Sequence, residues 1–163
     1  MSNEAKQDKA FVREAKLTDI AYLADNIREC DRKEVLIMSG ITPEQAFLEG
    51  YNHSDTPYVV EWQGKAIAMF GVSGEKGGTG VPWMLATNDI KGIRKDFIRG
   101  CKPYVEAMHK DYPVLTNFVW AENELHIAWL KWLGFKFADH LPLGREGEMF
   151  IHFYKEQDYV WSS

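Results

Sequence analysis

Three basic side chains, Lys91, Arg94 and Lys95, lie close together where the sequence predicts the start of a long helix. The N-terminus of a helix carries partial positive charge, so each basic group there costs about 0.3–1 kcal/mol unless an anion is present. A phosphate would remove that cost, because the free backbone N–H groups at a helix N-terminus attract anions. The pattern therefore predicts a phosphate site at this point. The alternative is an ordinary solvated helix face.

Two further polar residues, Asn123 and His126, fall at the start of another predicted helix. Asn123 is typical of a helix N-cap, since its side-chain oxygen can accept a hydrogen bond from a first-turn backbone N–H. His126 follows in the first turn, off the apolar stripe of the helix. A histidine titrates near neutral pH, so His126 could act in catalysis or contact a ligand. The alternative is a surface or hydrogen-bonded histidine without a chemical role.

Metal and redox motifs do not occur in this sequence. His140 and His152 have no partners at metal-ligand spacing, so we expect no metal. Cys30 and Cys101 lie far apart with no Cys-x-x-Cys pairing, which predicts two reduced thiols in the core. The glycine cluster at residues 74–80 is not followed by Gly-Lys-Ser/Thr, and it predicts a flexible hairpin loop instead of a phosphate-binding loop.

The stretch from Val114 to Phe137 predicts the elements that position Asn123 and His126, in the order strand, turn, helix, strand. Its first part is rich in β-branched and aromatic residues, which favours a buried strand. Apolar residues then recur at helical spacing. They are Leu125, Ala128, Trp129, Trp132 and Leu133. Gly134 is expected to end the helix, because glycine adopts the left-handed conformation at C′ without a Cβ penalty.

The rest of the chain predicts a mixed α/β sheet with helices on both faces. Thr42, Pro43 and Gln45 form a capping-box pattern at a helix start. Gln63 and Gly64 form a two-residue hairpin connection. The expected strands are 11–15, 58–62, 65–72, 81–87, 115–120, 136–139 and 148–154. The expected helices follow Thr18, begin at Arg32, and follow Thr42, Asn88 or Asp89, and Asn123.

The composition is that of one globular domain with a sizeable core, since 45% of the 163 residues are hydrophobic and 26% are charged. We expect a flexible tail at residues 1–9 and a single domain at residues 10–163. The net charge of −5 argues against a nucleic-acid partner, which normally meets a basic surface. No apolar run approaches a membrane span and the N-terminus has no hydrophobic signal core, so a cytoplasmic protein without a membrane partner is expected.

The asparagine, the amphipathic helix and the closing Leu-Gly-Phe at residues 123–135 resemble the second half of the GCN5-related N-acetyltransferase (GNAT) fold. Residues 117–130 are similar to the GNAT-like internal virion proteins of short-tailed bacteriophages. The resemblance implies a GNAT-like acyl-CoA N-acyltransferase fold. It implies a phage-encoded enzyme that moves an acetyl group from acetyl-CoA to an amine on a small molecule or protein. It also implies a location in the host cytoplasm or the virion.

The resemblance further implies which residues would bind the cofactor. Residues 85–94 stand where the family has its pyrophosphate loop, but they keep only Gly92 from its glycine pattern. A backbone N–H near Leu85 or Ala86 would polarise the thioester carbonyl. The implied cofactor-binding residues are Leu85, Ala86, Thr87, Lys91, Gly92, Ile93, Arg94, Asn123 and Trp129.

The implied chemistry needs a general base, for which Glu61, Glu75 and His126 are candidates by residue type. Leu130 stands where the family usually has a tyrosine general acid. A thiol with a pKa of about 8.5 can still leave as a thiolate without that acid. Leu130 and the altered loop favour a second hypothesis. In it the chain keeps the fold but has lost catalysis, and it acts as a virion protein or binds a host protein. A monomer or a homodimer fits either hypothesis.

Overall fold

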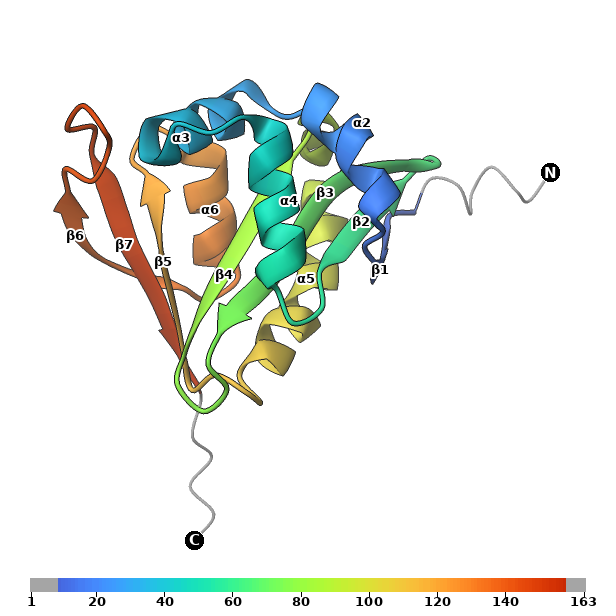
Figure 1. The fold of residues 1–163 in the computed structure, drawn as a ribbon. Helices are drawn as coiled ribbons and strands as arrows, with labels where there is room; N and C mark the ends of the chain where they lie inside the picture. Colours follow the sequence, from blue (N-terminus) through green and yellow to red (C-terminus); the bar gives the residue numbers. More distant parts are fainter. Residues whose placement is uncertain (1–8, 158–163) are drawn as a thin grey trace, which may run out of the picture.

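A seven-stranded mixed sheet forms the centre of the protein in the computed structural model, which describes residues 9–157 (Figure 1). Apart from Lys9, the predicted tail lies outside the described residues. The strands are β1 (Phe11–Glu14), β2 (Tyr58–Trp62), β3 (Lys65–Gly74), β4 (Thr79–Ala86), β5 (Val114–Trp120), β6 (Lys136–Leu141) and β7 (Phe150–Glu156). Their order across the sheet is β1-β2-β3-β4-β5-β7-β6.

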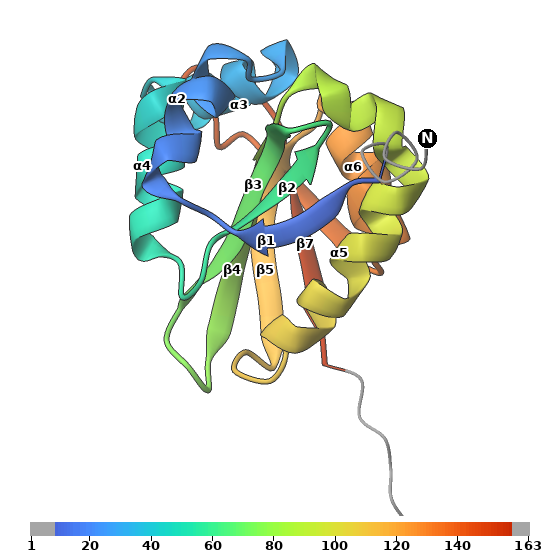
Figure 2. The same ribbon diagram turned by 90° about the vertical axis from the view of Figure 1, so that its right-hand side faces the viewer.

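Helices cover both faces of this sheet, as the sequence predicts (Figure 2). The α-helices are α2 (Ile20–Asp25), α3 (Glu29–Ser39), α4 (Pro43–His53), α5 (Arg94–Met108) and α6 (Glu124–Trp132). Two 3₁₀ helices, η1 (Leu17–Asp19) and η2 (Asn88–Ile93), precede α2 and α5. Helices α2 to α4 lie on one face, whereas α5 and α6 lie on the other. The mixed α/β architecture is therefore confirmed.

Local sequence signals set one turn and one helix start. Gln63 and Gly64 both have positive φ, 52° and 76°, as a type I′ hairpin turn requires. At the start of α4 the Gln45 N–H donates to Thr42 Oγ1 at 3.2 Å, and the Thr42 N–H donates to Gln45 Oε1 at 2.9 Å. The predicted hairpin and the predicted capping box are both confirmed.

The sheet opens between β4 and β5, which are its only parallel neighbours within residues 9–157. These strands pair only at Thr79 with Val114 and at Gly80 with Leu115. Gly80 is required there, because a Cβ would lie 2.7 Å from Cγ of Tyr112. Beyond this point β4 and β5 diverge, and α3 lies near their wide end (Figure 1). The divergence leaves a slot in the middle of the sheet.

Helix α3 begins at Glu29, before the predicted start at Arg32. Two other helix starts also differ from the prediction. Asn88 and Asp89 begin η2, and α5 starts only at Arg94 without a side-chain cap. Thr18 lies inside η1, where the Asp19 carboxylate accepts the Lys16 N–H at 2.8 Å. In both places a 3₁₀ turn precedes the α-helix, and 3₁₀ turns are frequent at helix termini.

The buried face of α6 is rotated by one position from the predicted stripe. Trp132 is 71% exposed, whereas Trp129 and Leu130 are buried. His126 also lies on the buried face, so placing it off the apolar stripe was wrong. The inner face of this short helix contacts buried polar side chains. Hydrophobic periodicity alone therefore cannot identify which face of α6 is buried.

Candidate functional site

The slot between β4 and β5 is bridged at its narrow part by a side chain. Asn117 Nδ2 of β5 donates to the carbonyl oxygen of Pro82 in β4 at 2.8 Å. Its Oδ1 accepts the N–H of Phe118 at 2.8 Å. One amide side chain thus replaces the backbone pairing that the two strands lose as they separate.

Further along β4, the backbone of Ala86 faces the slot. Thr87 donates its N–H to Ile67 of β3 at 2.8 Å, so strand alternation turns the Ala86 N–H and C=O away from β3. Both groups bond to the segment that begins α3. The Ala86 N–H donates to Asp31 Oδ2 at 2.9 Å, and the Arg28 N–H donates to the Ala86 oxygen at 2.8 Å.

The opposite edge of the slot bonds to the same helix. The Trp120 N–H of β5 donates to Glu34 Oε1 at 2.7 Å. Asp31 and Glu34 are one helical turn apart, so both side chains share one face of α3. Helix α3 therefore closes the wide end of the slot. One of its carboxyl groups accepts a hydrogen bond from β4, and the other accepts one from β5.

Asn123 links this closure to α6. It occupies the predicted N-cap position, but its side chain makes no capping hydrogen bond. Instead Nδ2 donates to Asp31 Oδ1 at 3.0 Å, and Asn123 is fully buried. The predicted capping bond is wrong, because the amide serves the buried Asp31 carboxylate.

Burial of this cluster shifts its ionisation. Arg28 Nη1 donates to Asp31 Oδ1 at 2.7 Å, and its guanidinium lies 5.5 Å from the Trp129 ring centroid. Burial raises the pKa of Glu34 to about 7. Burial also lowers the pKa of His126 below its usual range, which keeps the imidazole neutral at pH 7. Glu34 is therefore a group that can take up or release a proton near neutral pH.

The cluster holds several buried polar atoms without a hydrogen-bond partner among residues 9–157. They are Arg28 Nε, Asn123 Oδ1, His126 Nδ1 and Trp129 Nε1. Such atoms are rare, because leaving a buried donor or acceptor unpaired costs about 1–3 kcal/mol. Their concentration around α3 and α6 marks this region as the candidate functional site.

A cavity of about 480 Å³ adjoins the cluster. It reaches from Met38 of α3 through the slot to Phe97 of α5, and its lining is mainly apolar. Of the predicted site residues, the lining includes Leu85, His126 and Trp129. The cavity can hold a small apolar molecule or chain next to Glu34, which also lines it.

The predicted phosphate-binding residues lie apart from this lining. Lys91, Gly92 and Arg94 are exposed, and Ile93 is buried in the core. Most of them belong to η2, whose turns use backbone N–H groups internally. A Cβ on Gly92 would lie 3.1 Å from the Trp62 indole, so that ring lies close against the segment.

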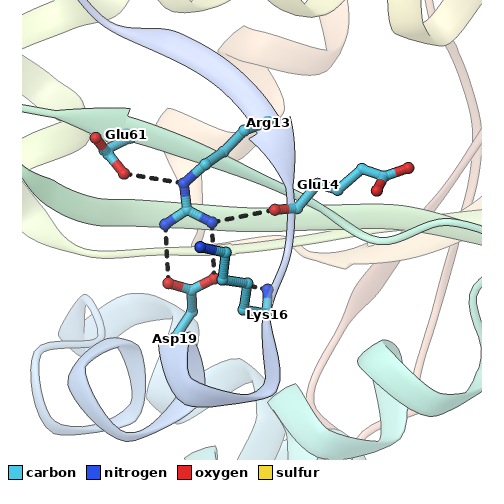
Figure 3. A network of polar contacts seen from close by, with 5 residues as sticks. All are labelled: Arg13, Glu14, Lys16, Asp19 and Glu61. Carbon is cyan, nitrogen blue, oxygen red and sulfur yellow. Dashed lines mark hydrogen bonds and ion pairs between the residues drawn. The ribbon is translucent and has the colours of Figure 1, made fainter.

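Two predicted base candidates also lie outside the cavity lining. Glu61 on β2 accepts a hydrogen bond from Arg13 Nε at 2.9 Å, in a network with Asp19 (Figure 3). Glu75 is exposed in the loop between β3 and β4. Of the three candidates, only His126 is brought to the cavity. The roles given to all the predicted site residues stay predictions.

The sequence reasoning missed Arg28, Asp31, Glu34 and Asn117. A usable signal exists in the first three, whose spacing of three residues places charged groups on one helical face. The same face carries Val35, which packs partly buried against the core. Charged residues in line with an inward-facing apolar residue indicate a buried polar cluster.

Two other sequence predictions concern the thiols and the membrane. Cys30 and Cys101 are both free, but only Cys101 lies in the core, so the predicted core position of Cys30 was wrong. Cys101 is buried, which raises its pKa to about 12, whereas Cys30 is only half-buried. Within residues 9–157, every helix is too short or too polar to cross a bilayer.

Solved structures of very different sequence share this fold. Ard1 from Thermoplasma volcanium has 10% identity and a TM-score of 0.68, covering 92% of this chain and 99% of that chain. Ribosomal-protein-alanine N-acetyltransferase from Brucella melitensis has 18% identity and a TM-score of 0.66, covering 90% and 99%. YncA, a putative acetyltransferase from Salmonella typhimurium with its cofactor acetyl-CoA, has 17% identity and a TM-score of 0.65, covering 94% and 96%. These likenesses establish the GNAT fold.

Sequence comparison adds a narrower relationship. No curated protein shows significant similarity to this chain. A family profile described as Bacteriophage T7, probable scaffold protein Gp13, matches residues 58–141, about half of the chain. The matched region runs from β2 to β6 and includes both edges of the slot. The chain therefore belongs to the family of the bacteriophage T7 probable scaffold protein Gp13, and it has the GNAT fold.

Proposed function

We propose that this protein is a non-catalytic GNAT-fold component of phage particle assembly. The observation that carries the proposal is the bond from the Ala86 N–H to the Asp31 carboxylate, at 2.9 Å. Ala86 is one of two residues whose backbone N–H would polarise a thioester carbonyl if acetyl-CoA bound as the resemblance implies. In this structure that donor already has an anionic acceptor.

The chemistry of acyl transfer explains why this bond matters. Attack on a thioester builds negative charge on the carbonyl oxygen, and catalysis needs a free donor aimed at that oxygen. The Asp31 carboxylate occupies the Ala86 donor and would repel a developing oxyanion. The Arg28 N–H occupies the Ala86 carbonyl as well. An extended cofactor arm would have to displace the start of α3 to pair with this part of β4.

Two other features support a structural role. Leu130 is buried in the cavity lining, where a tyrosine general acid is expected from the resemblance. The family description names a probable scaffold protein of a short-tailed phage. A packed fold without a working transfer site suits a protein that acts through its surface, and virion or host proteins are the proposed partners.

Calorimetry with acetyl-CoA and free CoA tests the first half of the proposal. We expect no binding heat with millimolar ligand, with an active GNAT enzyme as the positive control. Micromolar binding by the wild-type protein would contradict the proposal.

Genetic complementation in the encoding phage tests the second half. Removing the gene should lower the yield of complete particles. A Lys91→Glu, Arg94→Glu double variant should restore the yield, because a scaffold role does not use the implied phosphate contacts. Failure of a correctly folded double variant to restore particles would favour a cofactor-dependent role.

The second candidate function is N-acetyl transfer from acetyl-CoA to an amine acceptor. The observation that favours it is the cavity of about 480 Å³ with His126 and Glu34 in its lining. In this case Asn123 and Trp129 would lie along the cofactor, and Lys91 and Arg94 would contact its phosphates. Micromolar acetyl-CoA binding that weakens in the Lys91→Glu and Arg94→Glu variants would support this candidate.

A further inference from the structure

We propose that α3 is a proton-dependent cover of the slot between β4 and β5, closed while Glu34 is protonated and released when Glu34 ionises. The inference goes beyond the proposed function and applies whether or not the protein binds acetyl-CoA. It rests on how α3 is attached, on the strand edges that it covers and on the charges around Glu34.

Helix α3 is attached mainly through polar groups. Its only buried residue is Asp31, whereas α5 buries Phe97, Cys101 and Val105. Val35 adds a partly buried apolar contact. At the other end of the helix, the Arg145 N–H donates to the Ile37 oxygen at 2.9 Å. The N-terminal half of α3 can therefore leave the sheet without exposing a large apolar surface, while its C-terminal end stays tied to the β6–β7 loop.

The cover satisfies strand edges that would otherwise be open. Asp31 accepts the Ala86 N–H of β4, and Glu34 accepts the Trp120 N–H of β5. A protonated carboxyl group can still accept the Trp120 N–H through its carbonyl oxygen. Release of the helix would leave both N–H groups facing the slot and would open the cavity from the α3 side.

The groups around Glu34 make its ionisation unfavourable in the closed state. Arg28, before α3, and Asp31 form an ion pair, so a protonated Glu34 leaves the cluster neutral. The cavity lining adds Glu49 from α4 and His126 from α6, together with the Cys101 thiol of α5. His126 is buried and neutral, so it brings no positive charge. The Glu34 side chain is only partly accessible to water. Ionised Glu34 would therefore add a negative charge with no second cation among these groups to balance it.

The direction of the pH effect follows from proton linkage. The pKa of Glu34 is about 7 in this structure, against an ordinary value of 4.5. If release returns Glu34 to water, the open state binds the proton less tightly than the closed state. The opening equilibrium then rises with pH, by roughly tenfold between about pH 6 and about pH 8, and it levels off above that range.

Amide hydrogen exchange of the full chain, followed residue by residue by NMR, tests the proposal. Protection of the Ala86 and Trp120 amides, corrected for the intrinsic pH dependence of exchange, should fall roughly tenfold between about pH 6 and about pH 8. Amides of the β5–β7 pairing, such as Val119 and Phe153, should keep their protection and so report that the sheet stays folded.

Two variants separate this cover from general loosening. Glu34→Gln keeps an oxygen acceptor for Trp120 but cannot ionise, so its Ala86 and Trp120 protection should not change with pH. Glu106→Gln, at an exposed position on α5, should behave as the wild type. The proposal is overturned if Glu34→Gln shows the same pH-dependent loss as the wild type. It is also overturned if the wild type loses no protection, or loses it equally at Val119 and Phe153.

Discussion

Among residues 9–157, the Arg13 network and the Arg28 network join arginine and carboxylate groups in different surroundings. At the edge of the sheet, Arg13 contacts Asp19 and Glu61, with 24% and 12% of the Arg13 and Asp19 side chains exposed (Figure 3). At the slot, Arg28 contacts Asp31, with 5% and 1% of the side chains exposed, and Glu34 lies one turn further along. The first network fastens β1 to β2 and η1, whereas the second closes the wide end of the slot.

The difference between these networks shows that burial decides what a charged group can do. Arg13 keeps its charge, and its hydrogen bond to Asp19 raises its pKa further. At the slot, burial moves the pKa of Glu34 to about 7, and polar atoms of Arg28, Asn123 and His126 remain without partners. We infer that the Arg13 network is structural and that the Arg28 network is where the molecule can respond to protons or ligands.

The largest effect is expected from Asp31→Ala. This change leaves the buried Arg28 guanidinium without its carboxylate and leaves the Ala86 N–H without its acceptor. Removing one partner of a buried ion pair costs about 3–5 kcal/mol. Urea unfolding should show this loss, with Asp139→Ala, at an exposed position, as the control. A loss below about 1 kcal/mol would mean that the two networks are energetically alike.

A smaller effect, which depends on pH, is expected from Glu34→Gln. Wild-type Glu34 binds its proton more tightly when folded, so its contribution to stability is present below about pH 4.5 and is lost as the pH rises through about 7. The variant lacks this loss and should be more stable than the wild type at about pH 8, by about 1–3 kcal/mol. Urea unfolding across this pH range measures the difference in the free energy of unfolding. If that difference did not change with pH, the pKa of Glu34 would not be shifted by folding.

Asn117→Ala tests the bridge at the narrow part of the slot. The change leaves the Phe118 N–H and the Pro82 oxygen without their side-chain partners in a partly buried position. We expect a loss of about 1–2 kcal/mol in the free energy of unfolding. Asn52→Ala, at an exposed position on α4, serves as the control. An unchanged unfolding curve would show that the strands hold their separation without this side chain.

The smallest effect is expected from Arg13→Met, which removes the ion pairs of the partly exposed Arg13 network. Ion pairs that solvent still reaches are worth about 0–1 kcal/mol, because water and salt screen them. Methionine keeps most of the aliphatic length of the side chain. Thermal unfolding at low and high salt should differ little between wild type and variant. A loss comparable to that of Asp31→Ala would contradict the contrast between the two networks.

The sequence predicted the local elements well because short-range rules set them. The turn at Gln63 and Gly64 and the capping box at Thr42 depend on neighbouring residues alone. It predicted less well the segment from Asn88 to Ile93 and the buried face of α6. The first folds as a 3₁₀ helix, and the second faces polar side chains from α3, more than 80 residues earlier in the chain.

The sequence by itself determined most of the order of strands and helices and their mixed α/β class, because hydrophobic periodicity and capping act within a few residues. The fold family was implied separately, by the resemblance at residues 117–135. Only the tertiary structure decided which polar residues form the site. The spacing of Asp31 and Glu34 places both on one helical face, but what that face meets is known only once α3 is placed across the diverging strands. The open backbone edges of β4 and β5 then need acceptors, and the loss of water around those acceptors gives Glu34 its altered pKa.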